Sequence, residues 1–140
     1  MKNAIIAAIG VVGSFIASLF GGWTASLTTL LIFMGIDYVS GLVVAGVFHK
    51  SPKTETGALE SRAGLKGLLR KFTMLLFVLI GYRLDVAVGT TYIRDAVCIA
   101  FMANELISIV ENAGLMGLPV PSIITNAIDI LKKKSDGKGE

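Results

Sequence analysis

The chain opens on a long apolar stretch, since residues 3–36 contain no charged side chain. As one helix this stretch would measure about 50 Å, which exceeds the roughly 30 Å hydrocarbon core of a bilayer. Gly21 and Gly22 form the natural break, because glycine weakens a helix and permits a tight turn. Trp23, which follows them, is a residue type that prefers the membrane interface. The pattern therefore predicts two helices, at about residues 4–20 and 24–48.

The remaining apolar segments predict three more helices. The third, at about residues 67–88, has to include Arg83 and Asp85, which we expect to pair as Arg83 extends toward the outer interface. The fourth follows a short turn and covers about residues 92–112. Residues 122–140 should form an amphipathic helix and a lysine-rich tail. These segments indicate an all-α integral membrane protein with about four transmembrane helices, or three if the first helix lies flat or is re-entrant.

Composition supports a membrane location. Of the 140 residues, 54% are hydrophobic and only 16% are charged. A water-soluble domain of this size has too high a surface-to-volume ratio to hide so much apolar surface, whereas a bilayer supplies an apolar solvent. The lipid bilayer is therefore the expected partner of the chain.

Basic residues are concentrated in an internal loop at about residues 49–66, in the start of the helix that follows, and in the C-terminal tail. Under the positive-inside rule, the loop and the C-terminus are cytoplasmic parts of a multi-pass protein. The runs lack interleaved aromatic residues, so nucleic-acid binding is not expected. The basic residues of the internal region are Lys50, Lys53, Arg62, Lys66, Arg70 and Lys71.

The sequence holds no sign of catalysis. One cysteine, Cys98, excludes an internal disulfide, and one histidine, His49, excludes a Cys/His zinc site. No catalytic triad, phosphate-binding loop or metal constellation is present. We expect a protein that is not an enzyme and has no cofactor.

Polar residues inside the expected helices are the candidate functional residues. Asp37 lies in the second helix with Ser40 and Gly41 one turn away, although a helix end near Asp37 would explain it as well. Five polar residues of the fourth helix fall within an arc of about 120°, and the last two could simply mark the inner interface. Four short helices offer little surface to satisfy such groups, so we expect contacts between copies or a pore. The five are Asn104, Glu105, Ser108, Glu111 and Asn112.

The first helix carries small residues at four-residue intervals, Gly13, Ala17 and Gly21. This spacing lets membrane helices approach closely, although glycine and alanine are common in such helices in any case. It is a second candidate for close packing between helices.

Three segments together resemble the phage lysis holins, a family grouped with the toxin-secretion holins of Gram-positive bacteria. The first is similar to an Asp-x-x-Ser/Thr-Gly signature before a basic loop, the second to a Ser-x-x-Gly-x-x-Gly stretch with trailing basic residues, and the third to an Asn-Glu…Ser…Glu-Asn…Gly…Pro segment. In this chain they read Asp37-Tyr38-Val39-Ser40-Gly41; Ser61-Arg62-Ala63-Gly64-Leu65-Lys66-Gly67 with Arg70-Lys71; and Asn104-Glu105-Leu106-Ile107-Ser108-Ile109-Val110-Glu111-Asn112 with Gly114, Gly117, Pro119 and Pro121.

The resemblance implies a small protein of the host bacterial cytoplasmic membrane that oligomerises into lesions at a set time. A phage endolysin, or in some relatives a toxin, then leaves the cell, and the pairing with the endolysin requires no direct contact. The residues alone also allow two other functions. One is a small oligomeric ion or solute channel whose pore is lined by the fourth helix. The other is a membrane anchor for a partner complex that contacts the basic loop.

Overall fold

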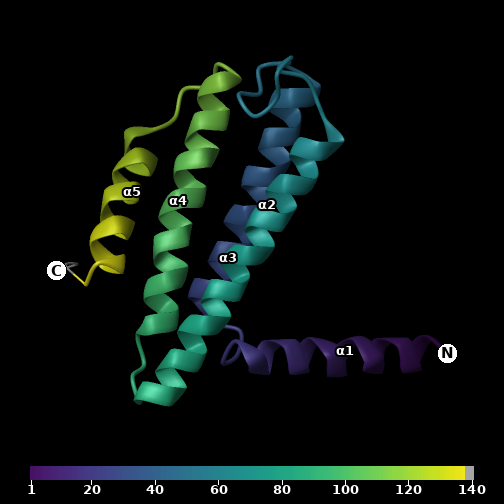
Figure 1. Ribbon diagram of the computed structural model, residues 1–140, viewed down its shortest axis with the longest axis vertical. Helices are drawn as coiled ribbons and strands as arrows, with labels where there is room; N and C mark the ends of the chain where they lie inside the picture. The colour runs from purple at the N-terminus through teal and green to yellow at the C-terminus, as the bar shows by residue number, and fades with distance from the viewer. Residues whose placement is uncertain (138–140) are drawn as a thin grey trace.

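The computed structural model describes residues 1–137, which form five helices and no strand (Figure 1). Helices α2, α3 and α4 lie side by side, α5 packs along α4, and α1 projects sideways from the end of the bundle where α2 begins. Residues 138–140, the end of the expected lysine-rich tail, lie outside the described part. The helices are α1 (Lys2–Leu19), α2 (Ala25–Gly46), α3 (Ser61–Val88), α4 (Ile93–Leu115) and α5 (Ser122–Ser135).

The break in the opening apolar stretch is confirmed. Gly21 and Gly22 take φ values of 81° and 97°, a region that favours glycine, and they form an elbow between α1 and α2. The new helix begins at a cap, because the Thr24 hydroxyl accepts a hydrogen bond from the Leu27 amide at 3.3 Å. The direction of the chain therefore changes where the sequence predicts it.

Arg94 of α4 holds this elbow. Its Nη1 donates hydrogen bonds to the carbonyl oxygens of Phe20 at 2.8 Å and Gly21 at 3.2 Å. The guanidinium also lies over the Tyr82 ring of α3, 5.9 Å from its centroid. The elbow is thus fixed to the end of the bundle where α3 turns into α4.

Helix α3 begins earlier than expected, at Ser61 rather than near residue 67. The expected loop over residues 49–66 therefore ends at Glu60, and the basic residues from Arg62 onward are helical. The helix continues through Gly64 and Gly67, which lie where Tyr38 of α2 packs on α3. The Tyr38 hydroxyl donates to the Gly64 carbonyl at 3.3 Å, and a Cβ on Gly67 would stand 3.6 Å from the Tyr38 ring.

The expected pair of Arg83 and Asp85 does not form. Asp85 is buried and accepts hydrogen bonds from the Thr90 hydroxyl at 2.6 Å and from the amides of Ile93 and Arg94 at 2.9 and 3.0 Å. These amides are the unsatisfied donors at the start of α4, so Asp85 caps that helix from the preceding one. Arg83 is exposed. Gly89, with φ of 81°, ends α3 and completes the tight turn.

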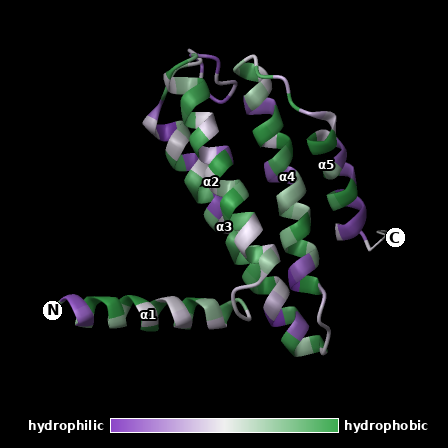
Figure 2. Ribbon diagram, turned by 180° about the vertical axis from the view of Figure 1, so that it is seen from behind, coloured by the Kyte–Doolittle hydropathy of each residue, from purple (hydrophilic) through white to green (hydrophobic). Residues whose placement is uncertain are grey.

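The core is small and lies in the middle of the bundle. Its buried residues come from α2, α3 and α4, and Leu131 of α5 packs against them. Large apolar side chains are otherwise mostly exposed, and α1 buries only Ala17. Figure 2 shows that much of α1 is hydrophobic. The core residues are Leu27, Leu30, Met34, Met74, Val78, Cys98 and Met102.

Two helices, α1 and α2, are long and apolar enough to cross a membrane. With the apolar exterior of the bundle, they identify a helical membrane protein. Helices α3 and α4 carry more charged residues, so whether they can insert into the bilayer depends on how these charges are paired.

The structure separates the three small residues of the first helix and generates a prediction. A Cβ at Gly21 would stand 2.3 Å from the Tyr82 ring, whereas a Cβ at Gly13 meets nothing within 4 Å. We expect Gly21→Ala to destabilise the protein by about 1–3 kcal/mol or more, because alanine disfavours a positive φ and the ring has to move. Gly13→Ala should leave stability unchanged or raise it slightly. Unfolding in detergent micelles measures both, and equal stabilities would contradict the elbow geometry.

Candidate functional site

Three charged side chains from three helices meet inside the bundle. Lys71 of α3 places its Nζ 2.6 Å from Asp37 Oδ2 of α2 and 2.5 Å from Glu105 Oε2 of α4. All three side chains are largely buried, with exposed fractions of 13% for Lys71, 6% for Asp37 and 4% for Glu105. One ammonium group thus links two carboxylates and joins all three helices of the bundle.

Asn112 of α4 completes this polar cluster. Its amide nitrogen donates to the carbonyl oxygen of Asp37 at 3.2 Å, to Asp37 Oδ1 at 3.1 Å and to Ser40 Oγ at 2.8 Å. Asp37 and Ser40 are three positions apart and share a helix face, and Gly41 next to them lies beside the Asn112 amide, where an added Cβ would stand 3.8 Å from Nδ2. Asp37, Ser40, Lys71, Glu105 and Asn112 are called the polar cluster below.

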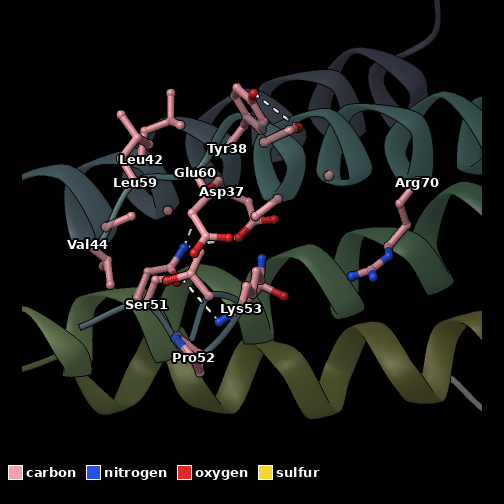
Figure 3. Close-up of a pocket in the computed structure, with 18 of the residues that line it drawn as sticks. Asp37, Tyr38, Leu42, Val44, Ser51, Pro52, Lys53, Leu59, Glu60 and Arg70 are labelled. Carbon is pink, nitrogen blue, oxygen red and sulfur yellow. Dashed lines mark hydrogen bonds between the residues drawn. The ribbon is translucent and has the colours of Figure 1, made fainter. Parts of the chain in front are cut away.

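A cavity of about 100 Å³ lies beside the polar cluster, under the loop that joins α2 to α3. Lys53 and Glu60 line it from the loop region, and Ser108 lines it from α4 (Figure 3). This volume suits a few water molecules. The close-up shows the Arg70 side chain lying apart from the Asp37 carboxylate. Lys71 is therefore the cation that partners the buried carboxylates.

The polar cluster offsets buried charge, with one ammonium group between two carboxylates, and it binds helices together. An unpaired ion in a low-dielectric interior is costly, and the ammonium offsets much of that cost for each carboxylate. Within residues 1–137, no group of three His, Cys, Asp or Glu residues could hold a metal ion.

The structure places the sequence-predicted residues in two groups. Asp37, Ser40, Glu105 and Asn112 come together inside one chain, so the expectation that four short helices could not satisfy them was wrong. Asn104 and Glu111 are exposed on α4. Their role in contacts between copies stays a prediction.

Lys71 is the residue that sequence reasoning misplaced, since it was assigned to the basic loop and the inner interface. A signal for its position exists in the helical spacing. Lys71 precedes four buried residues of α3 at alternating steps of three and four, which defines one inward face. By contrast, Arg62, Lys66 and Arg70 are exposed on the same helix. The four buried residues are Met74, Val78, Gly81 and Asp85.

Comparisons with known proteins agree with this class of small helical membrane protein. The model of the Bacteriophage holin family matches residues 14–133. The chain belongs to this family. Holins form pores and are not enzymes, so the family confirms that no catalysis is to be expected. It also implies a location in the cytoplasmic membrane.

Several relatives cover nearly the same length. An uncharacterised protein of Halalkalibacterium halodurans is 41% identical over 128 residues, which is 87% of this chain and 89% of the relative. An uncharacterised protein of Listeria innocua is 37% identical and spans 97% of this chain and 94% of its own. A probable holin of Bacillus phage phi105 is 28% identical over 81% of this chain and 79% of its own. No solved structure matches.

The polar cluster generates a stability prediction. We expect Lys71→Met to destabilise the bundle by about 3–5 kcal/mol, because two buried carboxylates lose their shared counter-charge. Lys66→Met is the matched control, an exposed lysine five residues earlier on α3, and it should change stability by less than about 0.5 kcal/mol. Equilibrium unfolding in detergent provides the measurement. Wild-type stability for Lys71→Met would show that the buried pairs contribute nothing.

Proposed function

We propose that this protein is a holin that accumulates in the host cytoplasmic membrane, oligomerises, and at a set time opens lesions that release a cell-wall hydrolase. The hydrolase passes through the lesion without binding the holin. Membership of the holin family supports this function. The observation that carries the proposal is the pairing of Lys71 with Asp37 and Glu105, because it allows α3 and α4 to enter lipid with α2.

The energetic argument concerns the charges in the middle of the bundle. A charged residue at the centre of a membrane helix costs about 2.5–3.5 kcal/mol on insertion scales. Asp37, Lys71 and Glu105 face one another and not the surface, so each is partnered when the helices insert as a unit. The outer surface of the same helices is rich in exposed leucine, isoleucine, valine and phenylalanine, which suits lipid.

The proposed topology places the α2–α3 loop and the C-terminus in the cytoplasm. Lys50 and Lys53 in the loop, with Arg62 and Lys66 on the first turns of α3, support this side under the positive-inside rule. Helix α1 is apolar on all sides and long enough to cross, so we assign it as a fourth span. In the structure α1 projects sideways from the bundle (Figure 1), so to cross the membrane it has to turn at the elbow of Gly21 and Gly22 toward the bundle axis.

Self-association would use the exposed polar residues of α4. Asn104 lines the cavity but is exposed and forms no hydrogen bond within residues 1–137, and Glu111 is exposed one turn before the helix ends. A polar group of this kind in lipid gains from a partner on another copy. The contacts between copies would therefore form around α4.

Release of a protein from the cell is the direct test of the proposed function. We expect controlled expression in a bacterium to cause abrupt release of a cytoplasmic reporter enzyme after a delay. Expression of the Lys71→Met variant should cause little or no release, because the bundle it forms is unstable. Discrete ion-selective currents without release of the reporter would instead favour a small channel, for which the polar cavity is the specific feature.

Two asparagines of α4 allow contacts between copies to be separated from stability within one chain. Asn104→Leu should change the time of lysis and leave the stability of the isolated chain within about 0.5 kcal/mol. Asn112→Leu should lower that stability by about 1–3 kcal/mol, because Asp37 and Ser40 lose their buried donor. Lysis timing and detergent unfolding are measured for both variants. An unchanged lysis time for Asn104→Leu would remove this residue from the proposed contacts.

A further inference from the structure

Helix α5 packs along α4 on the outside of the bundle. It packs on α4 through an apolar face that includes Ala127, Ile128 and Leu131, yet none of its residues is fully buried. Its last turn carries Lys132, Lys133 and Lys134, all exposed. Apolar residues on one face and consecutive lysines at one end are typical of a helix that lies on a membrane surface.

The position of α5 along α4 is the decisive observation. The helix starts at the end of the bundle that carries the α2–α3 loop and runs back along α4 (Figure 1). Leu131 packs against the core layer that contains Cys98 and Met102. The three lysines follow directly after Leu131, so they lie beside the apolar middle of the bundle.

This position conflicts with a membrane-spanning α4, an argument that rests on the proposed function. If α4 crosses the bilayer with α5 attached, the lysines enter the hydrocarbon layer. None of them forms an ion pair with an acidic residue in the described part of the chain. Because unpaired charges in hydrocarbon are strongly disfavoured, a spanning α4 and an attached α5 exclude each other.

We propose that α5 exchanges α4 for an anionic lipid surface when the bundle inserts. The apolar face enters the boundary between headgroups and acyl chains, and the lysines contact anionic headgroups of the leaflet on the α2–α3 loop side. The connection between α4 and α5 permits this movement, because residues 116–121 are not helical and Gly117 takes a φ of 79°. Pro119 and Pro121 keep α5 from continuing α4.

The exchange has a consequence for α4. While α5 is attached, it covers one side of α4, and that side becomes free when α5 moves to the lipid surface. A second copy gains access to that side of α4 only after this step. Binding to anionic lipid therefore acts before any association that uses the side covered by α5.

The test uses the full chain with Cys98→Ala, reconstituted in vesicles with or without phosphatidylglycerol. A bimane label at Leu131→Cys reports depth through quenching by lipids brominated near the headgroup, and the same label at the half-buried Ser135→Cys gives a second reading. We expect shallow quenching at both positions when phosphatidylglycerol is present. Replacing Lys132, Lys133 and Lys134 by glutamine should weaken this surface binding roughly a hundredfold, at about fivefold for each lysine.

Separate labelling shows whether α4 crosses the membrane. Thr91→Cys and Ser51→Cys should react with an impermeant reagent from opposite sides. If they do so while the α5 labels show no shallow quenching, or quenching that ignores anionic lipid and the lysines, the exchange is wrong and the spanning topology survives. If both react from the same side, the spanning topology is wrong, and the exchange with it.

Discussion

The contact of Lys71 with Asp37 and Glu105 is the interaction on which the bundle depends. It brings one residue from each of α2, α3 and α4 to a single point, where Asn112 adds hydrogen bonds to α2. Buried ion pairs seldom add much stability over a well-packed apolar core, yet removing one partner is severe. The cluster therefore acts as a constraint on assembly, because α2, α3 and α4 have to be packed together before any of these charges is satisfied.

This constraint explains why several charged side chains lie inside the bundle and many apolar ones lie outside, the reverse of a soluble protein. Charged groups that would face solvent in a soluble bundle are turned inward, and many of the large apolar side chains face outward. The apolar core proper is small and lies between two polar layers, with the polar cluster on one side and the Asp85 cap on the other. Each layer fixes the register of the helices through directional hydrogen bonds, which apolar packing alone specifies less strictly.

Most helices could be predicted from the sequence because their signals are local. The elbow at Gly21 and Gly22 follows from the length of the apolar stretch against the thickness of a bilayer, and glycine is the residue that permits it. The start of α3 was placed too late, since Gly64 and Gly67 weaken a helix and the packing of the distant Tyr38 on them is not visible in the sequence. The pairing of residues was equally hidden. Arg83 is close to Asp85 in sequence, yet Asp85 accepts its hydrogen bonds from the amides of Ile93 and Arg94.

Most residues of the candidate site could be predicted from the sequence, but the contacts between them could not. Asp37, Ser40, Glu105 and Asn112 were recognised as polar residues within apolar helices, but their contacts run inside the chain. Lys71 was missed because it stands at the border between basic and apolar segments, where an interfacial position is the simplest interpretation of a lysine. The helical spacing places Lys71 on the same face of α3 as the buried Met74 and Val78, and this decides its position inside the bundle.

The contact of Arg94 with the elbow has a mechanical consequence. Helix α1 is about 27 Å long and is held at one end by the two carbonyl groups that Arg94 binds. It can therefore rotate as a rigid rod about the elbow, which lies beside the first residues of α4. A rotation of about 10° at the elbow would carry Met1 through about 5 Å, so a small shift of α4 is amplified at the N-terminus.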